Sequence, residues 1–196
     1  HGKNVPVVVD AASEIPPKDI FKDYLAKGAD LVILSGGKEI RGPQSAGLIF
    51  GTKTMIEACH ANCCPQYSTG RPLKLDKETI AGMVRAFELF WERDYDAITL
   101  QWENMTNEMA RNLAQIQDAE VWVGYTSEPG IQPMCLPKVF FRSSRMEAKA
   151  LHAALIDRTP AIYTCLLHDT IILNAQCLQE SEMDIVCDAI RIEVSK

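Results

Sequence analysis

The segment SGGKEIRGPQ, residues 35–44, places Lys38 in a glycine-bracketed loop directly after an apolar run that ends at Leu34. An earlier apolar run, residues 5–9, ends at Asp10, which precedes Lys38 by 28 residues. Both runs are short and almost entirely apolar, as buried parallel strands are. The sequence therefore predicts an acid at the end of one strand and a lysine in a loop after the next.

An acid and a lysine in these positions suit an enzyme that uses pyridoxal 5'-phosphate (PLP). The lysine amine forms a Schiff base with the cofactor aldehyde, and a carboxylate pairs with the pyridinium nitrogen. The cationic ring then accepts the electrons that a broken Cα–H bond leaves behind. The spacing alone leaves a second interpretation open, in which Asp10 caps a turn and Lys38 is simply solvated.

Four motifs, taken in their order along the chain, resemble one enzyme family. They are VVDAASEIPP at residues 8–17, GADLV at 28–32, the segment around Lys38, and GRPLK at 70–74. The chain resembles the fold-type-I PLP enzymes related to bacterial selenocysteine synthase, L-seryl-tRNA(Sec) selenium transferase. Within that family it is more similar to the branch that includes D-glucosaminate-6-phosphate ammonia-lyase. The resemblance covers residues 6–77 and resumes at 158–162 and in the closing helix.

The resemblance implies an α/β fold, as the C-terminal part of a fold-type-I PLP-dependent transferase. Residues 1–75 would be the C-terminal segment of the PLP-binding large domain, residues 76–117 two connecting helices, and residues 118–196 a small α+β domain. Members of the family carry an N-terminal half of the large domain before this point. We therefore expect the chain to be the C-terminal portion of a longer enzyme and to be inactive alone.

Local patterns predict the elements of the first domain and of the connecting helices. A mostly parallel sheet is expected from strands at residues 5–9, 30–34 and 46–50, with helices at 16–26 and 52–60. Asp76 should cap the first connecting helix. Two apolar stripes are expected to pack in the core, namely Ile80, Met83, Val84, Phe87 and Trp91 in the first helix and Trp102, Met105, Met109, Leu113 and Ile116 in the second.

The small domain is predicted to contain four strands and two helices. The expected strands lie at residues 121–125 and 137–141, followed by a hairpin of 161–167 and 170–174 that turns at His168 and Asp169. A helix is expected at residues 145–155, and Ser181 should cap a last helix.

The resemblance assigns the cofactor residues. Lys38 would be the Schiff-base lysine and, once displaced by a substrate amine, the general base at Cα. Asp10 would pair with the pyridine nitrogen. Ser35 would bind the cofactor phosphate, although an ordinary strand-end hydroxyl is the alternative. Gly37 would let the backbone approach the cofactor closely.

Five residues are candidates for substrate binding, because an anionic substrate needs cationic or amide partners. They are Arg41, Gln44, Arg71, Lys74 and Arg158. Arg41 could instead make a dimer contact or be solvated. Arg158 occupies the region where fold-type-I enzymes often hold the substrate carboxylate, and a solvated loop arginine is the alternative.

The scaffold supports two reactions. An ammonia-lyase would act on a small anionic amino acid or a phosphorylated amino-sugar acid by Cα deprotonation and β-elimination. A selenium transferase would act on seryl-tRNA. In selenocysteine synthases the lysine segment resembles SGDKLLGGPQ, so Arg41 is an added charge here, and we favour the lyase. An aldolase or another β-eliminating activity also stays open. The alternative of another class is a catalytically incompetent fragment that lacks the N-terminal half.

Composition restricts the partners. The formal charge of −6 over 196 residues argues against a nucleic-acid surface, which needs clustered lysine and arginine. No apolar run reaches the ~18 residues of a membrane helix. Seven cysteines without C-x-x-C spacing suggest reduced thiols of a cytoplasmic protein. Cys59, His60, Cys63 and Cys64 are too crowded for a structural zinc site, so no metal is expected. A homodimer or higher homo-oligomer with shared active sites is expected from the resemblance.

Overall fold

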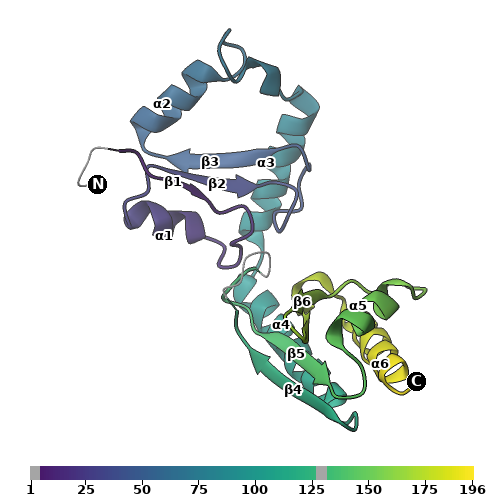
Figure 1. Ribbon diagram of the computed structural model, residues 1–196. Coiled ribbons are helices and arrows are strands. Elements are labelled where there is room, and N and C mark those ends of the chain that lie inside the picture. The colour runs from purple at the N-terminus through teal and green to yellow at the C-terminus, as the bar shows by residue number, and fades with distance from the viewer. Residues whose placement is uncertain (1–4, 127–131) are drawn as a thin grey trace. The chain divides into compact units, whose positions relative to one another are not determined.

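The computed structural model describes residues 5–126 and 132–196 and divides into two compact units (Figure 1). The first unit ends at Tyr95 and the second begins at Asp96. The division falls between the two helices that we expected to connect the domains. Helix α3 (Lys77–Glu92) belongs to the first unit, and α4 (Tyr95–Leu113) belongs to the second apart from its first residue.

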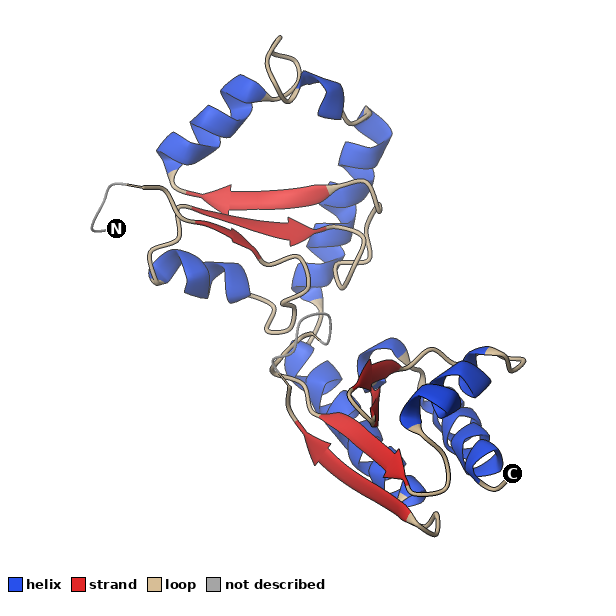
Figure 2. Cartoon of the chain, viewed as in Figure 1, coloured by secondary structure: helices blue, strands red, loops and turns tan. Residues whose placement is uncertain are grey.

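A three-stranded sheet forms the centre of the first unit, in the order β1-β2-β3 (Figure 2). Strand β1 (Val8–Asp10) runs parallel to β2 (Leu31–Ser35), and helix α1 (Ile20–Ala26) makes the crossover between them. Strand β3 (Gly47–Gly51) pairs with β2 antiparallel, with Ser35 opposite Gly47. The short link at residues 36–46 contains no helix, and a parallel crossover needs a dozen or more residues. The predicted mostly parallel sheet is therefore confirmed for only one of its two pairings: β1–β2 is parallel, and β2–β3 is antiparallel.

Helix α2 (Lys53–Asn62), a short 3-10 turn η1 (Arg71–Leu73) and α3 complete the first unit. Asp76 caps α3 as predicted, because its Oδ1 accepts a hydrogen bond of 2.6 Å from the Thr79 amide. The expected core stripe of α3 is wrong in part. Met83 is buried, whereas Ile80 and Val84 are 51% and 54% exposed. The described elements cover the Met83 side of the helix and leave the Ile80 side open.

Aromatic rings join α1, β3 and α3 in the core of the first unit. The rings of Phe21 and Phe50 stack with centroids 4.2 Å apart, and Phe87 contacts both Phe50 and Phe90 at about 6 Å. The ring of Tyr95 meets Phe90 edge-on at 5.3 Å. Such pairs add about 0.5–1.5 kcal/mol each beyond the area that they bury. The cluster therefore fixes α3 against the sheet.

The second unit is built on an antiparallel sheet in the order β4-β5-β7-β6. Its strands are β4 (Ala119–Gly124), β5 (Lys138–Ser143), β6 (Cys165–Leu167) and β7 (Thr170–Leu173). The predicted hairpin is confirmed, because β6 and β7 pair antiparallel across His168 and Asp169. The predicted core stripe from Trp102 to Ile116 is confirmed as buried, although α4 ends at Leu113 and Ile116 follows it.

Two further helices belong to this unit, α5 (Ala148–Ile156) and α6 (Met183–Val194). The prediction that Ser181 caps the last helix is wrong. Ser181 lies inside a 3-10 turn, Glu180–Glu182, that precedes α6. Gln179 and Glu182 form the capping box of that turn, and the Gln179 amide donates to Glu182 Oε2 at 2.8 Å. The Gln179 side chain accepts from the Glu182 amide in return, so these two residues satisfy the amides that Ser181 was expected to cap.

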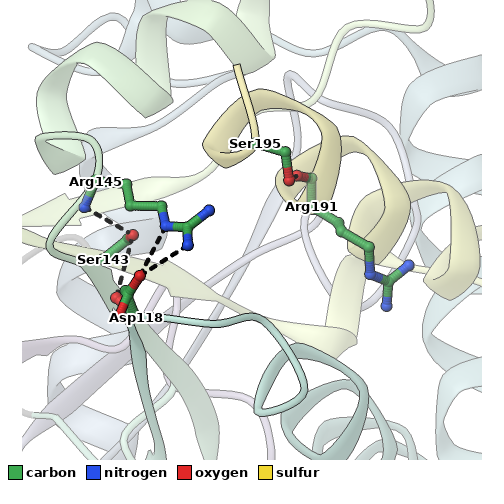
Figure 3. A network of polar contacts seen from close by, with 5 residues as sticks. All are labelled: Asp118, Ser143, Arg145, Arg191 and Ser195. Atoms are coloured by element: carbon green, nitrogen blue, oxygen red, sulfur yellow. Dashed lines mark hydrogen bonds and ion pairs between the residues drawn. The ribbon is translucent and has the colours of Figure 1, made fainter.

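A polar clamp closes the first rung of the β4–β5 ladder, where Ala119 faces Ser143 (Figure 3). Arg145 reaches Asp118 Oδ2 through both Nε (2.9 Å) and Nη2 (2.8 Å), and the Ser143 hydroxyl donates to the Asp118 carbonyl at 3.3 Å. Asp118 adopts a left-handed conformation with φ of 62°. The two-point arginine contact holds this turn in place.

Helices in the described part of the chain lack the combination of length and apolarity needed to cross a lipid bilayer. Within residues 5–126 and 132–196, no three or more histidine, cysteine, aspartate or glutamate side chains gather so that they could hold a metal ion.

Candidate active site

Asp10 and Ser35 lie at the same edge of the first sheet. Asp10 is the last residue of β1 and Ser35 the last of β2, and these two strands are parallel neighbours. The Ala11 amide continues the ladder by donating to the Ile33 carbonyl at 2.9 Å. Carboxyl ends of adjacent parallel strands are where open α/β sheets bind ligands. The exposed Asp10 side chain accepts a hydrogen bond of 3.1 Å from the Ala12 amide.

The two loops that follow these strands meet at the lysine amine. Lys38 Nζ donates to the Ser13 hydroxyl at 2.5 Å. Ser13 follows Asp10 by three residues, so both predicted catalytic residues are linked through the loop that carries Ser13. Ser13 was not predicted as a site residue. Its only sequence signal is its place inside the VVDAASEIPP motif.

Close packing explains the glycines of the Lys38 loop. A Cβ on Gly36 would lie 2.7 Å from the Ala46 carbonyl oxygen and would collide with Met83 Sδ of α3. The Gly36 amide donates to Ala46 at 2.9 Å, and the Gly42 amide donates to the Gly36 carbonyl at 2.7 Å. These bonds close the loop on itself. Lys38 therefore sits on a loop whose base is packed and hydrogen-bonded.

Gln44 fills the space beside Gly37 within the same loop. Gln44 Nε2 donates to the Gly37 carbonyl at 3.2 Å, and a Cβ on Gly37 would collide with the Gln44 side chain. The close approach of the Gln44 side chain is therefore the reason why a residue without a Cβ is needed at position 37. The expected contacts of Gly37 with the cofactor and of Gln44 with the substrate stay predictions.

Arg41 adopts a left-handed backbone conformation with φ of 60°. Its amide donates to the Lys38 carbonyl at 2.9 Å, which places it in the turn immediately after the lysine. The side chain is exposed. A left-handed conformation costs an ordinary residue about 1–2 kcal/mol relative to glycine, and such strain gathers at ligand sites.

Arg71 and Lys74 lie at the two ends of η1, in the connection between α2 and α3. Arg71 Nη1 donates to Cys64 Sγ at 3.3 Å, and the guanidinium lies 5.6 Å from the centre of the Tyr67 ring. Lys74 is exposed. In the described part of the chain, neither residue hydrogen-bonds or pairs with the Lys38 loop, so their substrate role stays a prediction.

Arg158 belongs to the second unit, where it forms an ion pair. Its Nη1 lies 2.5 Å from Glu193 Oε1, and Lys196 Nζ lies 2.6 Å from Glu193 Oε2. Glu193 is buried on α6. The hydrogen bond from Lys196 and then the one from Arg158 lower the Glu193 pKa below its ordinary value of 4.5. Arg158 therefore has a structural role, while its predicted role in substrate binding remains untested.

Arg158→Met should lower the free energy of unfolding of the second unit by about 1–3 kcal/mol at pH 7. Because the pKa of Glu193 is lower in the folded state, its pairing stabilises the fold above the ordinary pKa of 4.5 and is lost as pH falls through the folded value. Urea unfolding at pH 7 and pH 3 checks this expectation. The exposed pair of Arg191 and Asp188 supplies the control variant, Arg191→Met. If Arg158→Met lowers the free energy of unfolding equally at pH 7 and pH 3, the stabilising role of the Glu193 pairing is contradicted.

Comparison with known proteins identifies the family. The family model described as L-seryl-tRNA selenium transferase matches residues 7–179. A D-glucosaminate-6-phosphate ammonia lyase of Salmonella typhimurium is 40% identical over 88 residues, which are 45% of this chain and 22% of the relative. A 5'-C-glycyluridine monooxygenase-decarboxylase of a Streptomyces species is 40% identical over 118 residues, 57% of this chain and 26% of the relative.

A solved structure shows the same fold. The structure of a D-glucosaminate-6-phosphate ammonia-lyase matches with a TM-score of 0.68 at 23% identity, covering 100% of this chain and 51% of that one. This chain therefore spans about a quarter of the length of these curated relatives and about half of the solved chain. Its fold is mixed α/β and matches that of about half of the solved ammonia-lyase chain. The chain belongs to the L-seryl-tRNA selenium transferase family, which is a family of enzymes.

Proposed function

We propose that this chain holds PLP through Lys38 and contributes to a lyase that deprotonates Cα of a small anionic amino acid or phosphorylated amino-sugar acid. The observation that carries the proposal is the meeting of the β1 and β2 loops, where Lys38 Nζ reaches Ser13 three residues beyond Asp10. When bound, PLP would supply an electron-accepting ring. An amine and a carboxylate on adjacent loops, both exposed, fit that group.

Each site residue has a chemical task in this proposal. The Asp10 carboxylate would pair with the pyridine nitrogen and keep it protonated. The Ser35 hydroxyl at the end of β2 would donate to the phosphate, and Gly37 would let the backbone come close to the cofactor. Lys38 would hold the cofactor and take up the Cα proton once its amine is free. The Ser13 hydroxyl orients that amine.

The relatives named above have different activities, so we infer the substrate class from the residues of this chain's own Lys38 loop. Arg41 is the distinguishing one. Selenocysteine synthases resemble SGDKLLGGPQ in this loop and have glycine at its position, where the left-handed φ of 60° carries no penalty. This chain retains an arginine there at a cost of about 1 kcal/mol. An exposed guanidinium next to Lys38 suits a carboxylate or phosphate, which supports a small anionic substrate over seryl-tRNA.

Gln44, Arg71, Lys74 and Arg158 are proposed as additional substrate contacts. Gln44 lies beside Gly37 in the same loop as Arg41, so its amide can turn to a ligand without a change of backbone. Arg71 and Lys74 offer two positive charges for a phosphate.

A homo-oligomer with shared active sites, located in the cytoplasm, is part of the proposal. The exposed apolar side chains of the first unit support burial in an interface, and they include Val8, Ile49, Ile80 and Val84. The seven cysteines, all free thiols, suit a reducing compartment.

Arg41→Ala and Arg71→Ala should each raise KM for a phosphorylated amino acid by about 10–100-fold, if ~1.5–3 kcal/mol of charged hydrogen bonding is lost. Cofactor absorbance should stay nearly unchanged, because neither side chain is assigned to PLP. Steady-state kinetics of the full-length protein measure the effect. Arg85→Ala is the control, since Arg85 is exposed and pairs with Glu88 at 2.9 Å on the same helix.

If both variants lose PLP while KM stays constant, the two arginines serve the cofactor or a subunit contact. The small-anion substrate would then lose its main support. A KM that rises only for Arg41→Ala would retain the substrate class and remove Arg71 from the site.

A further inference from the structure

Glu39, the residue directly after Lys38, is hydrogen-bonded by the side chains of Tyr95 and Arg93. The Tyr95 hydroxyl donates to Glu39 Oε1 at 2.8 Å. Arg93 Nη1 donates to the Glu39 carbonyl at 3.2 Å and lies 3.9 Å from Glu39 Oε1. We call these three residues the Glu39 anchor. They join positions that are 54 and 56 residues apart in the sequence.

The anchor is largely shielded from water. The Glu39 side chain is 11% exposed and Tyr95 is 7% exposed. Burial and then the Glu39 carboxylate raise the pKa of Tyr95 well above its ordinary value of 10, so its hydroxyl stays a neutral donor at physiological pH. The Tyr95 ring is fixed in turn by Phe90, which is fully buried. Hydrogen bonds to a carboxylate in such surroundings are stronger than those between neutral groups.

The same chain segment also holds the loop that carries Ser13. Lys18 Nζ donates to the Trp91 and Arg93 carbonyls, both at 3.0 Å, and so caps the end of α3. Lys18 follows Ser13 by five residues, before α1. Residues 91–95 therefore bind the loop after β1 through Lys18 and the loop after β2 through Glu39. These are the two loops that meet at the Lys38 amine.

We propose that the Glu39 anchor is a positioning element for Lys38, with Glu39, Arg93 and Tyr95 as positioning residues. The anchor fixes the loop so that the Lys38 amine points to Ser13 rather than into solvent. It attaches that loop to the segment through which the chain passes from the first unit to the second, between Tyr95 and Asp96. Its chemical consequence rests on the proposed function, whereas its effect on the loop does not.

Hydrogen exchange in the full chain without added PLP tests the anchor directly. The amides of Arg41 and Gly42 are hydrogen-bonded inside the loop and report its opening. Tyr95→Phe and Glu39→Ala should speed exchange of these amides about tenfold, because each removes the hydroxyl–carboxylate bond. Glu39→Gln retains an acceptor oxygen for Tyr95 and should change exchange by less than about threefold. Tyr163→Phe in the second unit is the control, as Tyr163 is exposed.

A second measurement compares kcat and KM of the variants with PLP bound. Tyr95→Phe should lower kcat by about tenfold with little change in KM, because a misplaced amine affects the proton transfer more than substrate binding. Tyr163→Phe should leave both constants unchanged. The thermal midpoint of each variant shows whether the fold is retained.

If the amide hydrogens of Arg41 and Gly42 exchange at the wild-type rate in both Tyr95→Phe and Glu39→Ala, the proposed role of the Glu39 anchor is overturned. Equal exchange in Glu39→Gln and Glu39→Ala would also overturn it, since the hydrogen bond to Tyr95 would then not be what holds the loop. A failure of the wild-type protein to attach PLP to Lys38 would remove the proposed function instead. The exchange experiment would still decide whether the anchor holds the loop.

Discussion

Lys38→Ala should lower kcat/KM by about 10³-fold or more, because in the proposed function one amine would supply both the attachment of PLP and the base at Cα. General base catalysis alone contributes about 10²–10⁴-fold. The lysine is exposed on its loop and its amine hydrogen-bonds to the Ser13 hydroxyl, so its removal should leave the fold intact. Turnover and cofactor absorbance of the full-length protein measure the two functions of the amine separately.

Two variants control for charge and for the mere loss of a lysine. Lys38→Arg retains the positive charge but cannot attach the cofactor, and it should be as inactive as Lys38→Ala. Lys53→Ala removes a lysine whose side chain is 90% exposed and which pairs only loosely with Glu57, at 3.9 Å. It should retain wild-type turnover. Activity of Lys38→Ala within a few-fold of wild type would exclude Lys38 from catalysis.

Asp10→Asn should lower kcat/KM by about 10²–10⁴-fold, if bound cofactor covers the carboxylate and the loss of one partner of a buried charge pair costs ~3–5 kcal/mol. The variant separates the two interpretations of this residue. Asparagine retains an oxygen that accepts the hydrogen bond from the Ala12 amide, so the turn after β1 is preserved. It removes the charge that would keep the pyridine nitrogen protonated. PLP should still attach to Lys38 while turnover collapses.

Asp30→Asn is the matched control for Asp10→Asn. Asp30 Oδ2 also accepts a backbone hydrogen bond, from Val7 at 2.8 Å, but it lies before β2, at the edge of the sheet opposite Asp10. The Asp30→Asn variant should leave kcat/KM unchanged. Full activity of Asp10→Asn would mean that Asp10 is only a turn residue, and the proposed cofactor site would lose its carboxylate.

Local sequence patterns were sufficient to predict that Asp10 and Ser35, two residues of the proposed site, lie at one edge of the sheet. Two apolar runs linked by a helix imply parallel neighbours, and this places Asp10 and Ser35 at one edge. The β6–β7 hairpin was likewise predicted from its turn at His168 and Asp169. In both cases neighbours in the sequence become neighbours in the fold, which is why local patterns are informative there.

Long-range contacts explain what the sequence did not reveal. Glu39 meets Tyr95 across 56 residues, and no local pattern marks either as a partner. The helical period showed that α3 has an apolar face, but it could not show which part of that face the described elements cover, so Ile80 was assigned wrongly to the core. Ser181 was chosen as a cap by residue type, while the geometry favoured Gln179 with Glu182.

Peptide mapping tests whether PLP is attached covalently to Lys38. The full-length protein is incubated with PLP, reduced with borohydride, digested and analysed by mass spectrometry. We expect a phosphopyridoxyl group on the peptide that contains Lys38 in the wild-type protein, and no such group at this position in Lys38→Arg. A label on Lys53 or Lys74 instead, or no label on any lysine of the wild-type protein, would contradict this attachment.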